Sequence, residues 1–186
     1  MRRRGLVAVG FVALVIHCHL QVSASAGSLR DHGIESISPF STALKILQKQ
    51  IGYVFKSISL LRRAMTHASY SEENNKALSI LGASAIEAAV SLRSLINDVD
   101  VSAKDLTRRI SEISNVESSC TADGMRLGLE KVVRVSPKTN SSAPAVVCGA
   151  FRAVFGAIAV DNGTADSAGA VFWRVHGGGI GRAFAL

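Results

Sequence analysis

The chain of 186 residues is 48% hydrophobic and 5% aromatic, and its 21 Lys or Arg against 14 Asp or Glu give a net charge of +7. Three of the arginines fall in residues 1–26, so the rest of the chain carries only +4, which argues against a strongly basic nucleic-acid-binding surface. The remaining length of about 160 residues predicts one domain with its own hydrophobic core and leaves no length for a second.

Residues 1–26 have the features of a signal peptide. Three arginines at 2–4 precede an uncharged apolar run over 5–16, and Ala-Ser-Ala at 24–26 has the form of a signal-peptidase site. The apolar run is shorter than the roughly 20 residues that span a bilayer. We therefore expect entry into the secretory pathway or endoplasmic reticulum lumen, and no transmembrane span in the mature chain. Import into a chloroplast or mitochondrion is the alternative, because no acid precedes Asp31.

Apolar residues recur at helical spacings through the rest of the chain, and strand signals are few. After a linker over 27–40, the first predicted elements are a helix over 41–53 stopped by Gly52, a helix over 59–70 with Ser59 as N-cap, and a long apolar helix over 76–96. A helix over 102–115, begun by Ser102 and Asp105, is followed by a short helix that runs into an extended piece over 123–135 and is broken by Gly124 and Gly128. The last two are a buried helix over 145–163 and a helix that begins at Thr164 and stops at the glycines after His176. This order predicts an all-α domain over 41–176, followed by a Gly-rich tail over 177–186.

Two pairs of residues bear on the cellular compartment. Cys120 and Cys148 would suffice for one disulfide in an oxidising lumen, and two separate buried thiols are the alternative. Glycosylation sequons begin at Asn140 and Asn162, both in predicted loops. The sequons favour the secretory route.

The predicted domain resembles the endonuclease domain of the ribonuclease III family. The opening motifs are a Gly-Tyr-x-Phe turn at 52–55, a Leu-Leu helix, a Thr-His-x-Ser-Tyr element at 66–70 and a helix with Leu81-Gly82. Later in the chain, "AFRAVFGAIAVDNG" at 150–163 is similar to the second catalytic helix of that family. The resemblance implies the helical ribonuclease III fold. It also implies structural roles for four motif residues, namely Thr66, His67, Ser69 and Gly82.

The same resemblance implies two-metal hydrolysis of double-stranded RNA, in which active members use four carboxylates per protomer. Alignment on Leu81-Gly82 and on Ala150-Phe151 places four other residues at those positions, namely Ser79, Ala83, Gly149 and Arg152. Magnesium prefers hard oxygen ligands, and Arg152 adds positive charge. We therefore expect no metal site and no cofactor, with magnesium relevant only to a residual nuclease. Glu87 and Asp161 are the remaining nearby acids, and Glu87 is expected to pair with Arg152 or Arg93.

Binding of RNA has one candidate surface. Lys104, Arg108 and Arg109 form the densest basic group, on a single predicted helix, and a solvated helix face is the alternative. Members of the ribonuclease III family pair through the signature helix, here unusually apolar, so the resemblance implies a homodimer. A further protein partner is not identified by any motif.

Two stretches, "VVRVS" at 132–136 and "VVCGAFRA" at 146–153, are most similar to a plant branch of ribonuclease-III-like proteins named for a nuclear fusion defect. That similarity implies a catalytically degenerate, non-cleaving binding or structural protein linked to karyogamy in the female gametophyte. The alternative is a divergent RNA-processing or double-stranded-RNA-binding protein in an organelle.

Overall fold

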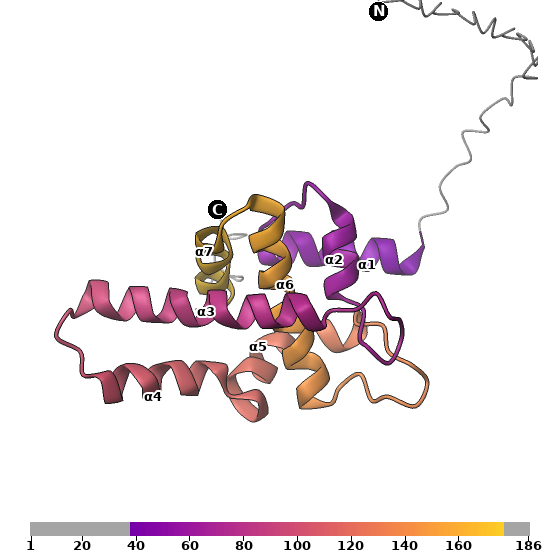
Figure 1. Ribbon diagram of the computed structural model, residues 1–186. Coiled ribbons are helices and arrows are strands. Elements are labelled where there is room, and N and C mark those ends of the chain that lie inside the picture. The colour runs from indigo at the N-terminus through magenta and orange to yellow at the C-terminus, as the bar shows by residue number, and fades with distance from the viewer. Residues whose placement is uncertain (1–37, 177–186) are drawn as a thin grey trace, which may run out of the picture. The chain divides into compact units, whose positions relative to one another are not determined.

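The computed structural model describes residues 38–176. The expected signal peptide, most of the linker and the Gly-rich tail lie outside these residues. The described elements are α1 (Pro39–Ile51), α2 (Ile58–Ala64), α3 (Lys76–Asn97), α4 (Ala103–Ser114), a π-helical turn (Val116–Cys120), α5 (Thr121–Arg126), a 3₁₀ turn (Leu129–Lys131), α6 (Pro144–Asn162) and α7 (Ala165–His176) (Figure 1). No strand occurs among them beyond an isolated bridge between Thr66 and Arg134, so the all-helical prediction is confirmed.

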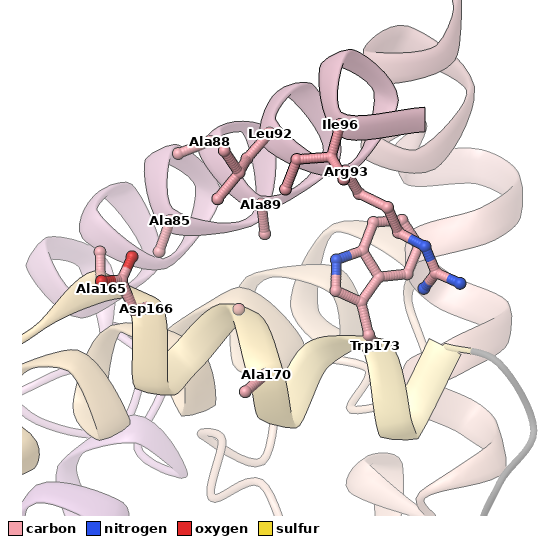
Figure 2. A pocket seen from close by; sticks show the side chains of 11 residues that line it. Ala85, Ala88, Ala89, Leu92, Arg93, Ile96, Ala165, Asp166, Ala170 and Trp173 are labelled. Atoms are coloured by element: carbon pink, nitrogen blue, oxygen red, sulfur yellow. The ribbon is translucent and has the colours of Figure 1, made fainter. Parts of the chain in front are cut away.

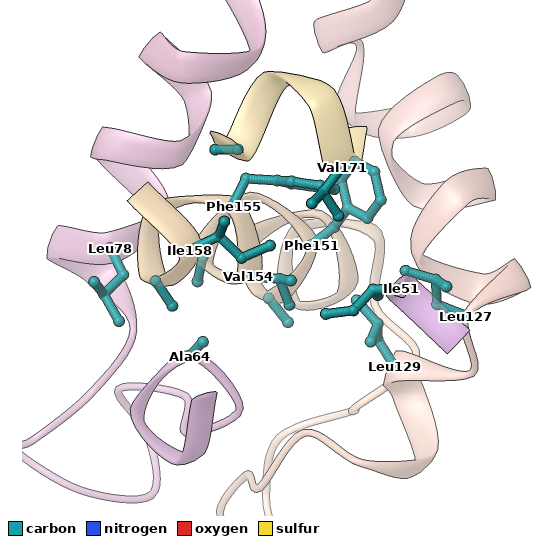
Figure 3. Packing of buried hydrophobic residues seen from close by; sticks show 14 of the residues in the cluster. Ile51, Ala64, Leu78, Leu127, Leu129, Phe151, Val154, Phe155, Ile158 and Val171 are labelled. Carbon is teal, nitrogen blue, oxygen red and sulfur yellow. The ribbon is translucent and has the colours of Figure 1, made fainter. Parts of the chain in front are cut away.

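Helix α6 forms the centre of the fold. Pro144 stands at its start, where a missing N–H costs nothing, and Gly163 ends it in the left-handed conformation with φ of 80°. Its side chains are buried on nearly every side because α2, α3, α5 and α7 all pack against it (Figure 3). Phe151 and Phe155 meet edge to face with centroids 4.9 Å apart, and Phe155 lies 5.6 Å from Phe172 of α7.

Two helices, α3 and α6, are long and apolar enough to cross a membrane by length and composition alone. A buried core helix passes the same test, and 67% of the apolar window of α6 is buried within the fold. The corresponding share for α3 is 28%, because α3 buries only one side against α6. Apolar residues on the other side of α3 are therefore left exposed.

The helix expected over 59–70 is shorter than the sequence suggested. It runs from Ile58 to Ala64, and its N-cap is Ser57 rather than Ser59. It stops because the next residues make other bonds: the backbone N–H of Arg134 donates to Met65 O at 2.9 Å, and that of His67 donates to Arg134 O at 2.9 Å. The helix propensity of this segment is thus overridden by backbone hydrogen bonds to a segment 68 residues further along the chain.

The segment between α4 and α6 also differs from expectation. The residues from Val116 to Cys120 form a π-helical turn that the pattern did not indicate, begun by Asn115, whose side chain accepts from Ser118 N at 3.0 Å. Gly124 lies inside α5 and does not break it. A Cβ built there would lie 2.5 Å from Val147 Cγ1, so this glycine is needed for close packing on α6. Gly128, with φ of 68°, ends that helix as expected.

Candidate functional site

The candidate site is built around the crossing of α3 and α6, where two glycines face each other. A Cβ built at Gly82 would lie 1.8 Å from the backbone oxygen of Arg152, and one built at Gly156 would lie 1.9 Å from the backbone oxygen of Leu78. The two backbones are therefore in direct contact, which only residues without a side chain permit. Gly82 therefore sets how closely α3 and α6 approach each other.

The four positions at which the resemblance implies metal ligands flank this crossing. Ser79 and Ala83 stand on either side of Gly82 on α3, and both are half-buried. Arg152 contacts Gly82 through its backbone, and Gly149 lies one turn earlier on α6 with open space where a Cβ would be. The chain brings the two pairs to one place, but none of the four residues supplies a carboxylate. Magnesium therefore does not fit the residues present.

Arg152 makes a structural contact instead. Its Nη2 donates to the backbone oxygen of Ser114, the last residue of α4, at 2.7 Å. A guanidinium is favourable at a helix C-terminus because the terminal carbonyls lack partners and carry partial negative charge. The side chain at this position thus fastens α4 to the central helix.

Glu87 does not form the ion pair expected for it. Within residues 38–176 no salt bridge joins Glu87 to Arg152 or Arg93, and the Glu87 side chain is exposed one turn beyond Ala83. The reason is that both candidate bases are engaged elsewhere: Arg152 reaches α4, and the guanidinium of Arg93 lies 4.3 Å from the ring centroid of Trp173. Among the described residues, no group of three or more His, Cys, Asp or Glu is placed to hold a metal ion.

A second feature lies on the other side of α3. A cavity of about 450 Å³ opens between α3 and α7, here called the α3–α7 groove (Figure 2). Its walls are mostly apolar and small, including Ala85, Ala88, Ala89, Leu92 and Ile96 on α3, and Gly169, Ala170 and Trp173 on α7. Figure 2 shows Arg93 and Trp173 together at one end and Asp166 toward the other. The groove is thus an apolar surface with one charge of each sign near its ends.

The groove continues into an exposed apolar row on α3, here called the α3 stripe. Leu81, Ala88, Leu92 and Leu95 follow one another at three-, four- and seven-residue spacings, which place them on one face of the helix. Leu92 is 56% exposed and Leu95 is 40% exposed. An exposed apolar row of this length is typical of a surface that another molecule covers.

Comparison with known proteins identifies the family. A family profile described as Ribonuclease-III-like matches residues 57–175, which include both helices of the crossing and both walls of the groove. The chain belongs to the ribonuclease-III-like family. The resemblance read from the sequence motifs is thereby confirmed.

Three relatives of this ribonuclease-III-like chain are informative. Protein NUCLEAR FUSION DEFECTIVE 2 of Arabidopsis thaliana is 63% identical over 145 residues, which cover 78% of this chain and 76% of the relative. Ribonuclease 3 of Phenylobacterium zucineum is 28% identical, and the match covers 72% of this chain but only 60% of that protein. The nuclease domain of Campylobacter jejuni ribonuclease III superposes with a TM-score of 0.67 at 23% identity, over 77% of this chain and 99% of that domain, which shows a common fold.

Asp161, the other remaining acid near the implied metal positions, has a structural role in the ribonuclease-III-like fold. One carboxylate oxygen accepts from Tyr53 Oη and Lys56 N, each at 2.9 Å, and the other accepts from Ser57 N at 2.8 Å. Burial raises the pKa of Asp161, but the N–H groups of Lys56 and Ser57 and the Tyr53 hydroxyl outweigh it and hold this pKa below its usual value. Burial, followed by the hydrogen bond to Asp161, raises the pKa of Tyr53 to about 12. Asp161 therefore holds in place the segment that leads into α2.

Replacing Asp161 with Ala is expected to lower the free energy of unfolding by about 2 kcal/mol at pH 7, because three hydrogen bonds to a charged acceptor are lost. The native carboxylate has a lowered pKa, so its contribution is present above the unfolded pKa of about 3.9 and is lost as pH falls through the folded value. The difference in the free energy of unfolding between the native chain and Asp161→Ala, measured in urea, should shrink as pH falls from 5 to 2. Glu72→Gln, at an exposed acid, serves as control, and an Asp161→Ala deficit that is independent of pH would contradict the assignment.

The Thr-His-x-Ser element forms a hydrogen-bonded corner. Thr66 Oγ1 donates to Arg62 O at 2.8 Å and accepts from Arg134 Nη2 at 2.5 Å. His67 Nδ1 accepts from Ser69 N at 3.1 Å, and Ser69 Oγ accepts from Ser136 N at 3.1 Å. These bonds tie the end of α2 to residues 134–136. His67 Nδ1 is also hydrogen-bonded with Ser69 Oγ at 2.9 Å, so the histidine holds the same serine that accepts from Ser136 N. The contacts are those of an anchor.

The basic group of α4 is partly neutralised. Arg108 forms ion pairs with Glu112 at 2.9 Å and with Asp105 at 3.4 Å, while Lys104 is exposed. The Ser102 hydroxyl, and then Arg108, lower the pKa of Asp105. Arg109 lines a separate cavity of about 220 Å³ beside Glu112. The three cations therefore do not form a uniform basic surface.

One buried cluster was missed by the sequence reading. Asp123, only 5% exposed, bonds to His176 Nδ1 and to Arg126 Nη2, each at 2.6 Å, and Arg126 also donates to Val175 O. The cluster fastens the end of α7 to α5. No local pattern could have revealed it, because Asp123 and His176 are 53 residues apart.

Proposed function

We propose that this ribonuclease-III-like chain is a homodimeric binding or structural protein that does not cleave RNA. The observation that carries the proposal is the contrast between the two sides of α3. On the side of the α3–α6 crossing, residues without carboxylates stand where the family's metal ligands are implied. On the other side, the α3–α7 groove and the α3 stripe form an exposed apolar surface that a second copy can cover.

The chemistry of the crossing supports the first half of the proposal. Two-metal hydrolysis needs carboxylate oxygens that hold the ions against RNA phosphates. Here Ser79 offers one neutral oxygen, Ala83 and Gly149 offer none, and Arg152 carries a positive charge that is bound to α4. Glu87 is a single exposed acid on that face, and one carboxylate per protomer is too few for a magnesium site.

The shape of α3 supports dimerisation. In a two-fold pair the same patch meets itself, so a surface that combines projecting side chains with a groove can be self-complementary. Leu81 projects from the α3 stripe near the start of α3, and the groove lies along the second half of the helix. An antiparallel arrangement of two α3 helices would place Leu81 of each copy toward the groove of the other. The Campylobacter jejuni nuclease domain is described as flexible in a region involved in dimer formation.

The compartment and the biological process belong to the same proposal. The signal-like segment over 1–26 and the disulfide between Cys120 and Cys148, whose Cα atoms are 5.2 Å apart, both favour an oxidising lumen. The 63% identity to NUCLEAR FUSION DEFECTIVE 2 links the chain to nuclear fusion in plants. We infer a luminal role, with location in a chloroplast or mitochondrion as the outcome that would replace it.

The purified chain is expected to leave double-stranded RNA intact in magnesium or manganese, at enzyme concentrations where a bacterial Ribonuclease 3 digests the substrate completely. Gel electrophoresis of a labelled duplex measures this, and sedimentation of the same sample measures its mass. Cleavage that disappears in Glu87→Ala would contradict the proposal. Co-purification of RNA with the chain from an organelle would favour an RNA-binding function instead.

A further inference from the structure

We propose that Asn140, and not Asn162, is the acceptor of an N-linked oligosaccharide. This inference rests on the proposed luminal location, since the donor, a lipid-diphosphate-linked oligosaccharide, is available only there. Both residues begin an Asn-x-Ser/Thr sequon and both are exposed, so sequence and accessibility do not separate them. The conformation and bonding of the two side chains do.

The transfer defines what an acceptor needs. The amide nitrogen Nδ2 forms a bond to the anomeric carbon of the donor sugar, the bond from that carbon to the diphosphate oxygen breaks with its electron pair leaving on the diphosphate, and the amide releases one proton. The nitrogen must therefore be free of competing hydrogen bonds, and the residues after it must turn back so that the hydroxyl at the third position can approach.

Asn140 meets both conditions. It lies in the segment over 136–143, before α6, and its Oδ1 accepts from Ser142 N at 2.9 Å, which forms an Asx-turn. The backbone turns at the same place, because Ala143 N donates to Asn140 O at 3.2 Å. Within residues 38–176, Asn140 Nδ2 has no hydrogen-bond partner. Ser142 is also exposed.

Asn162 does not meet the first condition, and the hydroxyl of its sequon is already engaged. It is the last residue of α6, and its Nδ2 donates to Ser167 Oγ while its Oδ1 accepts from Lys56 Nζ at 3.2 Å. The hydroxyl of its sequon, that of Thr164, is hydrogen-bonded with Ser167 Oγ at 3.1 Å. Transfer to Asn162 would have to break these contacts at the start of α7.

The positions of the two residues relative to the groove also favour Asn140 as the acceptor. Asn162 lies three residues before Ala165, which lines the α3–α7 groove, so a glycan there would crowd the proposed dimer surface. The loop that carries Asn140 lies at the opposite side of the domain from α7 (Figure 1). An oligosaccharide on Asn140 is therefore compatible with dimerisation.

The test is translation of the full chain with endoplasmic reticulum microsomes, in two forms: with its own first residues, and behind a proven secretory leader. Protease protection reports entry into the lumen, and an endoglycosidase-sensitive shift in gel mobility reports glycosylation. One shift is expected, lost in Asn140→Gln and Ser142→Ala and retained in Asn162→Gln and Ser141→Ala.

The outcomes separate the two proposals. If the chain is unprotected with its own first residues but shows one Asn140-dependent shift behind the proven leader, the luminal location fails and the assignment of the acceptor stands. If the protected chain shows no shift, two shifts, or a shift that Asn162→Gln removes, the assignment of Asn140 is overturned and the luminal location is unaffected.

Discussion

Gly82→Ala should destabilise the protein by at least about 3 kcal/mol, which for a domain of this size lowers the melting temperature by roughly 10 °C. The added methyl group would lie 1.8 Å from the backbone oxygen of Arg152 and 2.8 Å from the backbone nitrogen of Gly156. No rotation of a side chain can relieve a clash with backbone, so α3 and α6 must move apart. The cavity and lost contacts that follow add to the cost.

The matched control for Gly82→Ala is Gly149→Ala in α6. Nothing lies within 4 Å of a Cβ built at Gly149, and the residue is helical with a negative φ. Alanine at such a site is expected to stabilise by about 0.5–1 kcal/mol because it restricts the unfolded chain. Urea unfolding followed by circular dichroism measures both variants. Equal effects at the two positions would show that the crossing tolerates separation and that Gly82 is not required for contact.

Leu92→Glu is expected to convert the proposed dimer into a monomer at micromolar concentrations. Leu92 lies in both the α3 stripe and the α3–α7 groove and is 56% exposed in the single chain. Burial of a leucine contributes about 2 kcal/mol, and a two-fold interface contains the residue twice, so about 4 kcal/mol is lost before the cost of burying two carboxylates. The dissociation constant should therefore rise by about a thousandfold.

The control for Leu92→Glu is Ile46→Glu on α1. Ile46 is 53% exposed and is not among the residues that line the groove, so the substitution has similar chemistry without the predicted interface. Sedimentation equilibrium or multi-angle light scattering measures the mass, and circular dichroism checks that both variants remain folded. A native chain that is monomeric at 100 times the concentration used for the variants would contradict the dimer. A dimeric Leu92→Glu protein would place the interface elsewhere.

The sequence was sufficient for the features that depend on local pattern. The helical spacing over 76–96, the Ser102 and Asp105 start of α4, and the glycines at 52, 128 and 163 all appear in the structure near their expected places. These features depend on neighbours within about four residues, which is the range over which periodicity and capping act. The motif order also identified the ribonuclease III fold, because long, ordered spacings are specific even when each motif is weak.

The sequence by itself determined most of the helices, the family and the identity of the residues at the four implied metal positions. Only the tertiary structure decided what those residues and their neighbours do. It directs Arg152 to the end of α4, uses Asp161 to hold the segment before α2, leaves Glu87 without the expected ion pair, and joins Asp123 to His176. It also separates Asn140 from Asn162, although their sequons read alike. The physical reason is that the partner of a polar side chain is set by which distant segments the core brings within about 3 Å, and helical periodicity contains no information about that distance.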